Sequence, residues 1–178
     1  MVDSPHTCTL VLGGARSGKS RHAEGLCRES GLSKLYIATA AAHDSEMEER
    51  IDAHKSMRAA EGWQTIEEQH DLAGKLASSL ASDRIALVDC LTLWLTNRLL
   101  ADADLAAETD RLCEAIERRA GPVVFVSNET GLGIVPENAL ARRFRDAQGI
   151  LNQRVAALST HVHLVAAGLP LVLKEPNS

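Results

Sequence analysis

Aromatic side chains are scarce in this sequence, since Phe, Trp and Tyr together make up 3% of its 178 residues. A folded core therefore has to be built from Leu, Val, Ile and Ala. Apolar residues still account for 45% of the chain, which lies in the ordinary range for globular proteins and argues against a disordered chain. A chain of this length suits one domain, and we expect residues 1–178 to form a single domain with one full core.

An excess of positive charge is also missing, because the formal net charge at pH 7 is −5. Proteins that bind nucleic acid or anionic membranes over a broad surface need basic residues that neutralise phosphate groups. We therefore expect no nucleic-acid partner for this chain. A small anionic ligand needs only a local positive charge and remains possible.

Long apolar runs and clustered cysteines are absent as well. No apolar run approaches 18 residues, and the first residues do not show the basic and apolar segments of a signal peptide. We expect a cytoplasmic protein without membrane insertion. The cysteines are widely spaced and form no C-x-x-C pair, so they predict neither a disulfide framework nor a structural metal: Cys8, Cys27, Cys90 and Cys113.

One motif stands out against these absences. Residues 13–20 read Gly-Gly-Ala-Arg-Ser-Gly-Lys-Ser, which fits the phosphate-loop pattern G-x-x-x-x-G-K-[ST] and lies between an apolar run and a helix-compatible stretch. In such a loop, backbone N–H groups at a helix N-terminus bind phosphate, the lysine reaches the β- and γ-phosphates, and the Ser hydroxyl holds Mg²⁺. The motif predicts a nucleotide site with a catalytic lysine, made of Gly13, Gly14, Ala15, Arg16, Ser17, Gly18, Lys19 and Ser20.

Strands and helices alternate along the chain. The apolar patterns predict strands at 7–12, 34–39, 63–67, 84–89, 122–127 and 161–166, and helices at 19–29, 71–79, 90–100, 104–119 and 138–158. Residues 170–173 can pair with 161–166 as a hairpin through Gly168. This order predicts an α/β fold of the RecA-like, phosphate-loop kind: a mainly parallel sheet with helices on both faces and an antiparallel C-terminal edge. If the first two strands are parallel neighbours, residues 38–40 lie near the phosphate loop.

Asp89 ends the apolar strand predicted at 84–89. A carboxylate at the end of a buried parallel strand can face the phosphate loop and hold Mg²⁺, either directly or through water, together with the hydroxyl of Ser20. The alternative is that Asp89 caps the helix that follows it.

A polar helix is predicted at 45–61. Residues 45–48 read Ser-Glu-Met-Glu, the S-x-x-E form of a capping box, and Gly62 provides a left-handed end. Basic and histidine side chains at i, i+4 and i+8 share one face of this helix, which is not typical of a helix that packs on a core: Arg50, His54 and Arg58.

Four stretches together point to a family. The phosphate loop, the Glu-Met-x-x-Arg-Ile-x-x-His stretch at 46–54, Trp-Gln-Thr-Ile-Glu at 63–67 and the loop at 128–138 resemble the bifunctional adenosylcobinamide kinase / adenosylcobinamide-phosphate guanylyltransferases of cobalamin biosynthesis. The resemblance covers nearly the whole chain. It implies phosphorylation of adenosylcobinamide by ATP or GTP, then transfer of GMP from GTP to adenosylcobinamide phosphate, and it implies a homotrimer.

In that family a histidine carries the guanylyl group as a phosphoramidate, and the matching residue here is His54. A neutral imidazole nitrogen can attack the α-phosphorus without a separate base. The resemblance also maps nucleotide contacts onto Ala38, Thr39, Ala40, Lys55, Ser56, Met57, Arg58, Glu67 and Asp89. The histidines outside the motif are expected to be structural or on the surface: His6, His22, His43, His70, His161 and His163.

Two other functions stay open at this point. A small-molecule kinase without guanylyl transfer needs only Lys19, Ser20 and Asp89, but it leaves His54 unexplained. A non-enzymatic module that uses the phosphate loop as a nucleotide-dependent switch is the second. A covalent, acid-labile label from GTP distinguishes both from the bifunctional enzyme.

Overall fold

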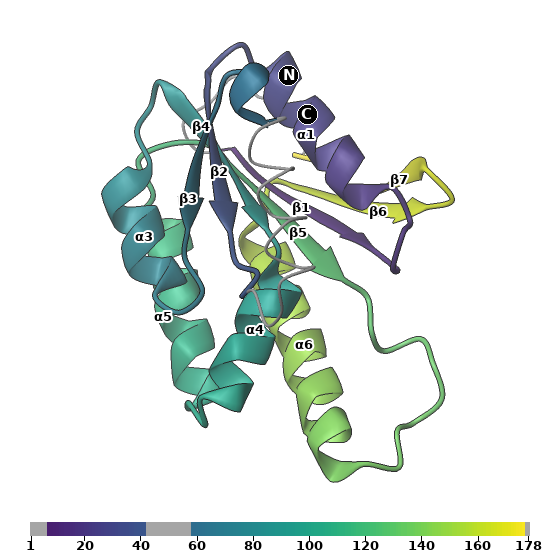
Figure 1. Ribbon diagram of the computed structural model, residues 1–178. Helices are drawn as coiled ribbons and strands as arrows, with labels where there is room; N and C mark the ends of the chain where they lie inside the picture. The colour runs from purple at the N-terminus through teal and green to yellow at the C-terminus, as the bar shows by residue number, and fades with distance from the viewer. Residues whose placement is uncertain (1–6, 42–57, 177–178) are drawn as a thin grey trace.

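The computed structural model describes residues 7–41 and 58–176, and a seven-stranded sheet forms its centre (Figure 1). The strand order is β3-β2-β4-β5-β1-β6-β7. The strands are β1 (Cys8–Gly13), β2 (Ser33–Ala38), β3 (Trp63–Glu67), β4 (Arg84–Asp89), β5 (Val123–Asn128), β6 (His161–Ala166) and β7 (Leu169–Lys174). Strands β1 to β6 pair in parallel, and β7 pairs antiparallel with β6. The predicted sheet, with its antiparallel C-terminal edge, is confirmed.

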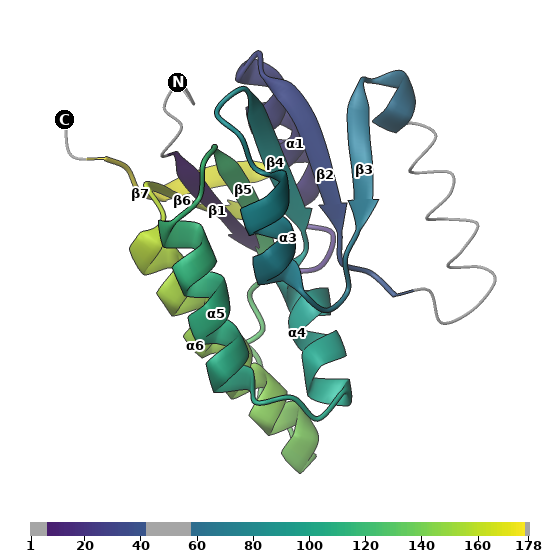
Figure 2. The ribbon, with the colours of Figure 1, turned by 90° about the vertical axis from the view of Figure 1, so that its left-hand side faces the viewer.

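Helices cover both faces of the sheet, as Figure 2 shows. Helix α1 (Lys19–Glu29) packs on one face against side chains such as Val11 and Leu87. The helices on the other face pack against Leu10 and Phe125 and are α3 (Leu72–Ser79), α4 (Leu91–Leu100), α5 (Leu105–Glu117) and α6 (Ala139–Leu158). Because both faces are covered, the central strands are continuous apolar runs, and each fully buried Leu, Val or Phe contributes about 1.5–3 kcal/mol.

Several element boundaries were predicted to the residue. Helix α1 and strands β3 and β4 begin and end where the sequence patterns place them. Helix α5 begins one residue later than the predicted 104–119, because the Asp104 side chain accepts hydrogen bonds from the first turn and precedes the helix as its N-cap. The helix ends at Glu117, two residues before the predicted end. The predicted helix at 45–61 lies mostly outside the described residues. Its left-handed end is confirmed at Gly62, which has a φ of 79°.

The first two strands of the chain are parallel but are not neighbours in the sheet. Strands β5 and β4 lie between β1 and β2. Their parallel register still brings the strand ends together, since Ala38 pairs with both Glu67 and Asp89, and Gly13 pairs with Asn128. One carboxyl edge of the sheet therefore carries the end of the phosphate-loop strand and the ends of β2, β3, β4 and β5.

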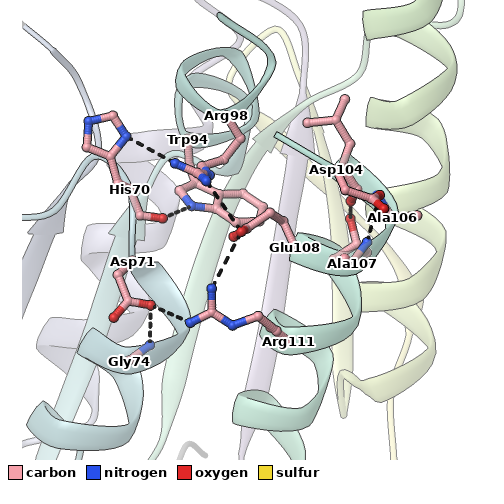
Figure 3. Close-up of polar contacts among 12 residues, drawn as sticks. His70, Asp71, Gly74, Trp94, Arg98, Asp104, Ala106, Ala107, Glu108 and Arg111 are labelled. Atoms are coloured by element: carbon pink, nitrogen blue, oxygen red, sulfur yellow. Dashed lines mark hydrogen bonds and ion pairs between the residues drawn. The ribbon is translucent and has the colours of Figure 1, made fainter. Parts of the chain in front are cut away.

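Polar contacts join the start of α3 with α4 and α5, as Figure 3 shows. The guanidinium of Arg111 lies 3.0 Å from the carboxylate of Asp71 and 3.5 Å from that of Glu108. The indole N–H of Trp94 donates to the backbone carbonyl of His70 at 3.0 Å. These bonds fix the segment that follows β3 and so help to hold the end of that strand in place. In the described part of the chain, no helix combines the length and apolar character needed to cross a membrane.

Candidate active site

The phosphate loop connects β1 to α1 and is closed by its own main chain. The backbone N–H of Ser17 donates to the carbonyl oxygen of Gly14 at 3.3 Å, and the ammonium of Lys19 reaches back to the same oxygen at 3.1 Å. Gly18 precedes α1 with a φ of 96°, a conformation that glycine adopts without a steric penalty. The loop thus has the turn and the helix N-terminus that a phosphate site requires.

The C-terminal hairpin supports this loop from the other side. The backbone N–H of Gly168, in the turn between β6 and β7, donates to the carbonyl oxygen of Ser17 at 2.8 Å. A Cβ atom at Gly18 would lie 3.1 Å from the Cα of Gly168, so the two backbones touch. The sequence pattern identified the loop and the hairpin separately and did not indicate that they meet.

Asp89 lies at the end of β4 and accepts a hydrogen bond from the hydroxyl of Tyr36 at 2.9 Å. Helix α4 has Cys90 as its N-cap and no side-chain cap, so the structure does not support the alternative that Asp89 caps this helix. Burial raises the pKa of the Tyr36 hydroxyl, which therefore stays protonated and acts as the donor.

Arg58 and Glu24 complete a charged group around Tyr36. The guanidinium carbon of Arg58 lies 3.5 Å from the centroid of the Tyr36 ring, which is a cation–π contact. Burial raises the pKa of the Glu24 carboxyl, Arg58 opposes this rise, and the charge of Asp89 adds to it. Sequence reasoning missed Glu24, although it follows the predicted metal ligand Ser20 by one helical turn.

Thr39, at the end of β2, is bonded to α4 through both its side chain and its main chain. It is fully buried, and its hydroxyl donates to the carbonyl of Cys90 and accepts from the N–H of Cys90, both at 2.7 Å. The side chain of Asn97 donates to the carbonyl of Thr39 at 2.8 Å. These bonds tie the end of β2 to the start of α4. Nucleotide contact by Ala38, Thr39 and Ala40 stays a prediction.

Asn128 ends β5, between the phosphate-loop strand and the strand of Asp89. Its backbone N–H donates to the hydroxyl of Thr92 at 2.8 Å, and its carbonyl accepts from the side chain of Asn152 at 3.1 Å. Its side-chain Oδ1 is buried and has no hydrogen-bond partner among the residues that the structure describes. The next residue, Glu129, donates its backbone N–H to the carbonyl oxygen of Gly13 at 3.2 Å. The sequence singled out the loop at 128–138 as part of the family resemblance but gave Asn128 no role of its own.

Several of the predicted site residues lie at one edge of the sheet, and others are not among the residues that the structure describes. The phosphate loop, Ala38, Glu67 and Asp89 follow or end strands that share this edge of the sheet. The predicted nucleophile His54 and its neighbours Lys55, Ser56 and Met57 lie outside the described residues. Arg58 is the first described residue after them and contacts Tyr36.

The oxygen atoms at this edge fit Mg²⁺. The candidate ligands are the hydroxyl of Ser20, at the start of α1, and the carboxylate of Asp89. Within residues 7–41 and 58–176, no group of three or more His, Cys, Asp or Glu side chains is placed to hold a metal on its own. Magnesium suits such a site, since it binds one or two protein oxygens together with phosphates and water.

The sheet order and the loop between β1 and α1 define a phosphate-loop protein with a RecA-like fold. A solved ATPase domain aligns with 98% of this chain and 79% of its own, with a TM-score of 0.57 and 10% identity. The RadB recombinase aligns with 90% of this chain and 74% of its own, with a TM-score of 0.50 and 17% identity. At these identities the likeness concerns the fold alone.

The chain belongs to the cobinamide kinase / cobinamide phosphate guanyltransferase family, whose model matches residues 9–173. It is 51% identical to the bifunctional adenosylcobalamin biosynthesis protein CobP of Pseudomonas aeruginosa, over 94% of this chain and 98% of that protein. It is 44% identical to the bifunctional adenosylcobalamin biosynthesis protein CobU of Salmonella typhimurium, over 93% of this chain and 98% of that one.

Family membership establishes the activity. The chain is a bifunctional enzyme of adenosylcobalamin biosynthesis, a kinase for cobinamide and a guanylyltransferase for cobinamide phosphate, with nucleoside triphosphates as substrates. Membership in this family excludes the two other functions that the sequence left open, the kinase without guanylyl transfer and the non-enzymatic switch.

Proposed function

We propose that the carboxyl edge of the sheet binds the nucleotide for the kinase step on adenosylcobinamide. The observation that carries the proposal is that the phosphate loop and Asp89 emerge at this one edge, separated by the single strand β5. In the reaction, the substrate hydroxyl attacks the γ-phosphorus of ATP or GTP. The bond between that phosphorus and the β–γ bridging oxygen breaks, and the nucleoside diphosphate leaves.

Each residue of the edge has a separate part in this step. The backbone N–H groups of the phosphate loop surround the phosphates, and the ammonium of Lys19 neutralises the charge that develops on the β- and γ-phosphate oxygens. Ser20 and Asp89 hold Mg²⁺, which when bound supplies further positive charge to the phosphates. Ala38, Ala40 and Glu67 contact the nucleotide from the neighbouring strand ends. Thr39, whose polar atoms are used inside the protein, holds Ala40 in place.

For the second step we propose His54 as the nucleophile. Its imidazole nitrogen attacks the α-phosphorus of GTP, the bond to pyrophosphate breaks, and GMP stays on the histidine. A phosphate oxygen of adenosylcobinamide phosphate then attacks the same phosphorus, which breaks the P–N bond and regenerates the imidazole. Arg58 binds the phosphates of GTP, and Lys55, Ser56 and Met57 contact the nucleotide. The position of Arg58 against Tyr36, close to Asp89, supports a site next to the phosphate loop.

The test is to capture the covalent intermediate. The protein is incubated with [α-³²P]GTP and Mg²⁺ and then denatured, and the labelled peptide is sequenced. We expect one label, in the peptide with His54, that is stable to base and released by mild acid, as a phosphoramidate is. A label that survives acid, or one in another peptide, would overturn the assignment of His54.

We also propose that the enzyme is a cytoplasmic homotrimer. Large apolar side chains are exposed on β7 and on the loop after β5, an amount of exposed apolar surface that favours a subunit contact. They are Leu132, Ile134, Leu169, Leu171 and Leu173. Light scattering on the purified protein should give the mass of three chains, and the mass of one chain would contradict the trimer.

A further inference from the structure

Tyr36 makes two polar contacts that link residues with different proposed roles. It is the one tyrosine of the chain, and its side chain is buried beneath α1, next to Leu87. Its hydroxyl donates to Oδ2 of Asp89 at 2.9 Å, and its ring lies under the guanidinium of Arg58 at 3.5 Å. Asp89 belongs to the kinase step and Arg58 to the guanylyl transfer.

The hydroxyl contact restricts the carboxylate of Asp89. A hydrogen bond to a charged acceptor is stronger than one between neutral groups, and it holds the acceptor in one rotamer. The bond uses Oδ2, and a carboxylate has a second oxygen for other ligands. Because Tyr36 is buried, this donor cannot swing into solvent. The carboxylate is thus set in one direction before nucleotide or metal binds.

The ring contact restricts Arg58 in the same way. An arginine side chain loses much rotamer freedom when it is held, and a cation–π contact at a buried ring offsets part of that cost. The rings of Trp63 and Tyr36 meet in a T-shaped contact, with centroids 6.0 Å apart at 85°, an arrangement that a phenylalanine at position 63 can also make. Arg58 is therefore held beside the segment that carries His54 in the sequence.

We propose that Tyr36 is a positioning residue shared by the two reactions: its hydroxyl orients Asp89 for the kinase step, and its ring orients Arg58 for the guanylyl transfer. This inference rests on the proposed roles of Asp89 and Arg58. The two functions of the tyrosine are separable, since phenylalanine keeps the ring and loses the hydroxyl, whereas leucine loses both.

Binding of a fluorescent GTP analogue, titrated with Mg²⁺, gives a readout that does not depend on turnover. In Tyr36→Phe we expect the Mg²⁺ concentration for half-maximal binding to rise roughly 10-fold, the effect of losing one hydrogen bond to a charged group. The kinase rate should fall at low Mg²⁺ and recover at high Mg²⁺. The yield of covalent GMP at saturating Mg²⁺ should match that of the parent.

Tyr36→Leu should show the same Mg²⁺ defect and also form the covalent intermediate more slowly. Trp63→Phe is the matched control for packing, because it changes the neighbouring ring and neither polar contact of Tyr36. Its Mg²⁺ dependence and covalent labelling should equal those of the parent, and thermal unfolding of each variant checks that it is folded.

The variants Asp89→Asn and Arg58→Ala distinguish a failure of the inference about Tyr36 from a failure of the proposed roles of Asp89 and Arg58. If Asp89→Asn leaves the Mg²⁺ dependence unchanged, the assignment of Asp89 fails. If Asp89→Asn shifts it and Tyr36→Phe does not, Asp89 keeps its role and the positioning role of the tyrosine hydroxyl is wrong. If Arg58→Ala slows covalent labelling and Tyr36→Leu does not, the ring has no positioning role. A shift in Trp63→Phe equal to that in Tyr36→Phe would reduce Tyr36 to a packing residue.

Discussion

The N–H of Gly168 and the carbonyl oxygen of Ser17 form a 2.8 Å hydrogen bond that joins the C-terminal hairpin to the phosphate loop. The bond lies beside Gly18, whose left-handed conformation allows the loop to turn into α1. The conformation of the loop therefore depends on a segment near the other end of the chain.

Gly18→Ala should weaken nucleotide binding and lower the free energy of unfolding. A non-glycine residue with φ near 96° is strained, and the new methyl group meets the Cα of Gly168 at 3.1 Å. We expect a loss of about 1–2 kcal/mol. Gly149→Ala, in α6 where a methyl group meets nothing within 4 Å, should instead stabilise the protein by about 0.5–1 kcal/mol. Denaturant unfolding gives the change in the free energy of unfolding for both variants, and equal changes at the two positions would refute the argument.

Asp89→Asn should keep the fold and lose most of the Mg²⁺-dependent kinase activity. An amide has the shape of the carboxylate but lacks the charge that balances the metal, and it can still accept a hydrogen bond from Tyr36. The check is a titration of kinase activity with Mg²⁺, alongside thermal unfolding. Unchanged activity and unchanged Mg²⁺ dependence would show that Asp89 does not hold the metal.

The His22 and His163 pair should make stability depend on pH. Their ring nitrogens lie 2.8 Å apart, and burial lowers the pKa of both imidazoles. The charge of Glu29 opposes this lowering of the pKa at His22. At His163 the charge of Glu175 opposes it, and His161 adds to it. The unfolded value is about 6.5, so the contribution of the neutral pair is fully present above that pH and is lost as pH falls through the lower folded value.

His163→Gln should therefore show a flatter decline of unfolding free energy between pH 7 and pH 5 than the parent. His70→Gln, which removes a histidine outside this cluster, serves as the control for the loss of one histidine. Urea unfolding at several pH values gives the comparison. A His163→Gln slope identical to that of the parent would mean that the pair does not control acid stability.

His54→Ala should separate the two activities of the enzyme. The kinase step forms no bond to the protein, so the variant should still phosphorylate adenosylcobinamide. Guanylyl transfer needs a nucleophile that alanine lacks, so neither covalent GMP nor adenosylcobinamide-GDP should form. Covalent label retained in His54→Ala would move the nucleophile elsewhere, with His43 as the next residue to replace.

Lys19→Ala should lose the kinase step, because the transition-state charge on the phosphates loses its main side-chain cation.

The sequence by itself determined the local elements and the type of chemistry. Clear turn residues and apolar runs specify strands β3 and β4 and helix α1, because these signals act between residues a few positions apart. The phosphate loop is identified for the same reason, since all its groups come from eight consecutive residues. The family resemblance placed His54 and the neighbouring contacts, which remain predictions.

Only the tertiary structure decided which elements meet. No local pattern states that β5 separates the strand of the phosphate loop from the strand of Asp89, because the order of parallel strands depends on long connections and on how both faces of the sheet are covered. The same holds for Gly168 beneath the phosphate loop and for Tyr36 between Arg58 and Asp89. Their partners are distant in sequence, and packing of the whole sheet brings them within contact distance.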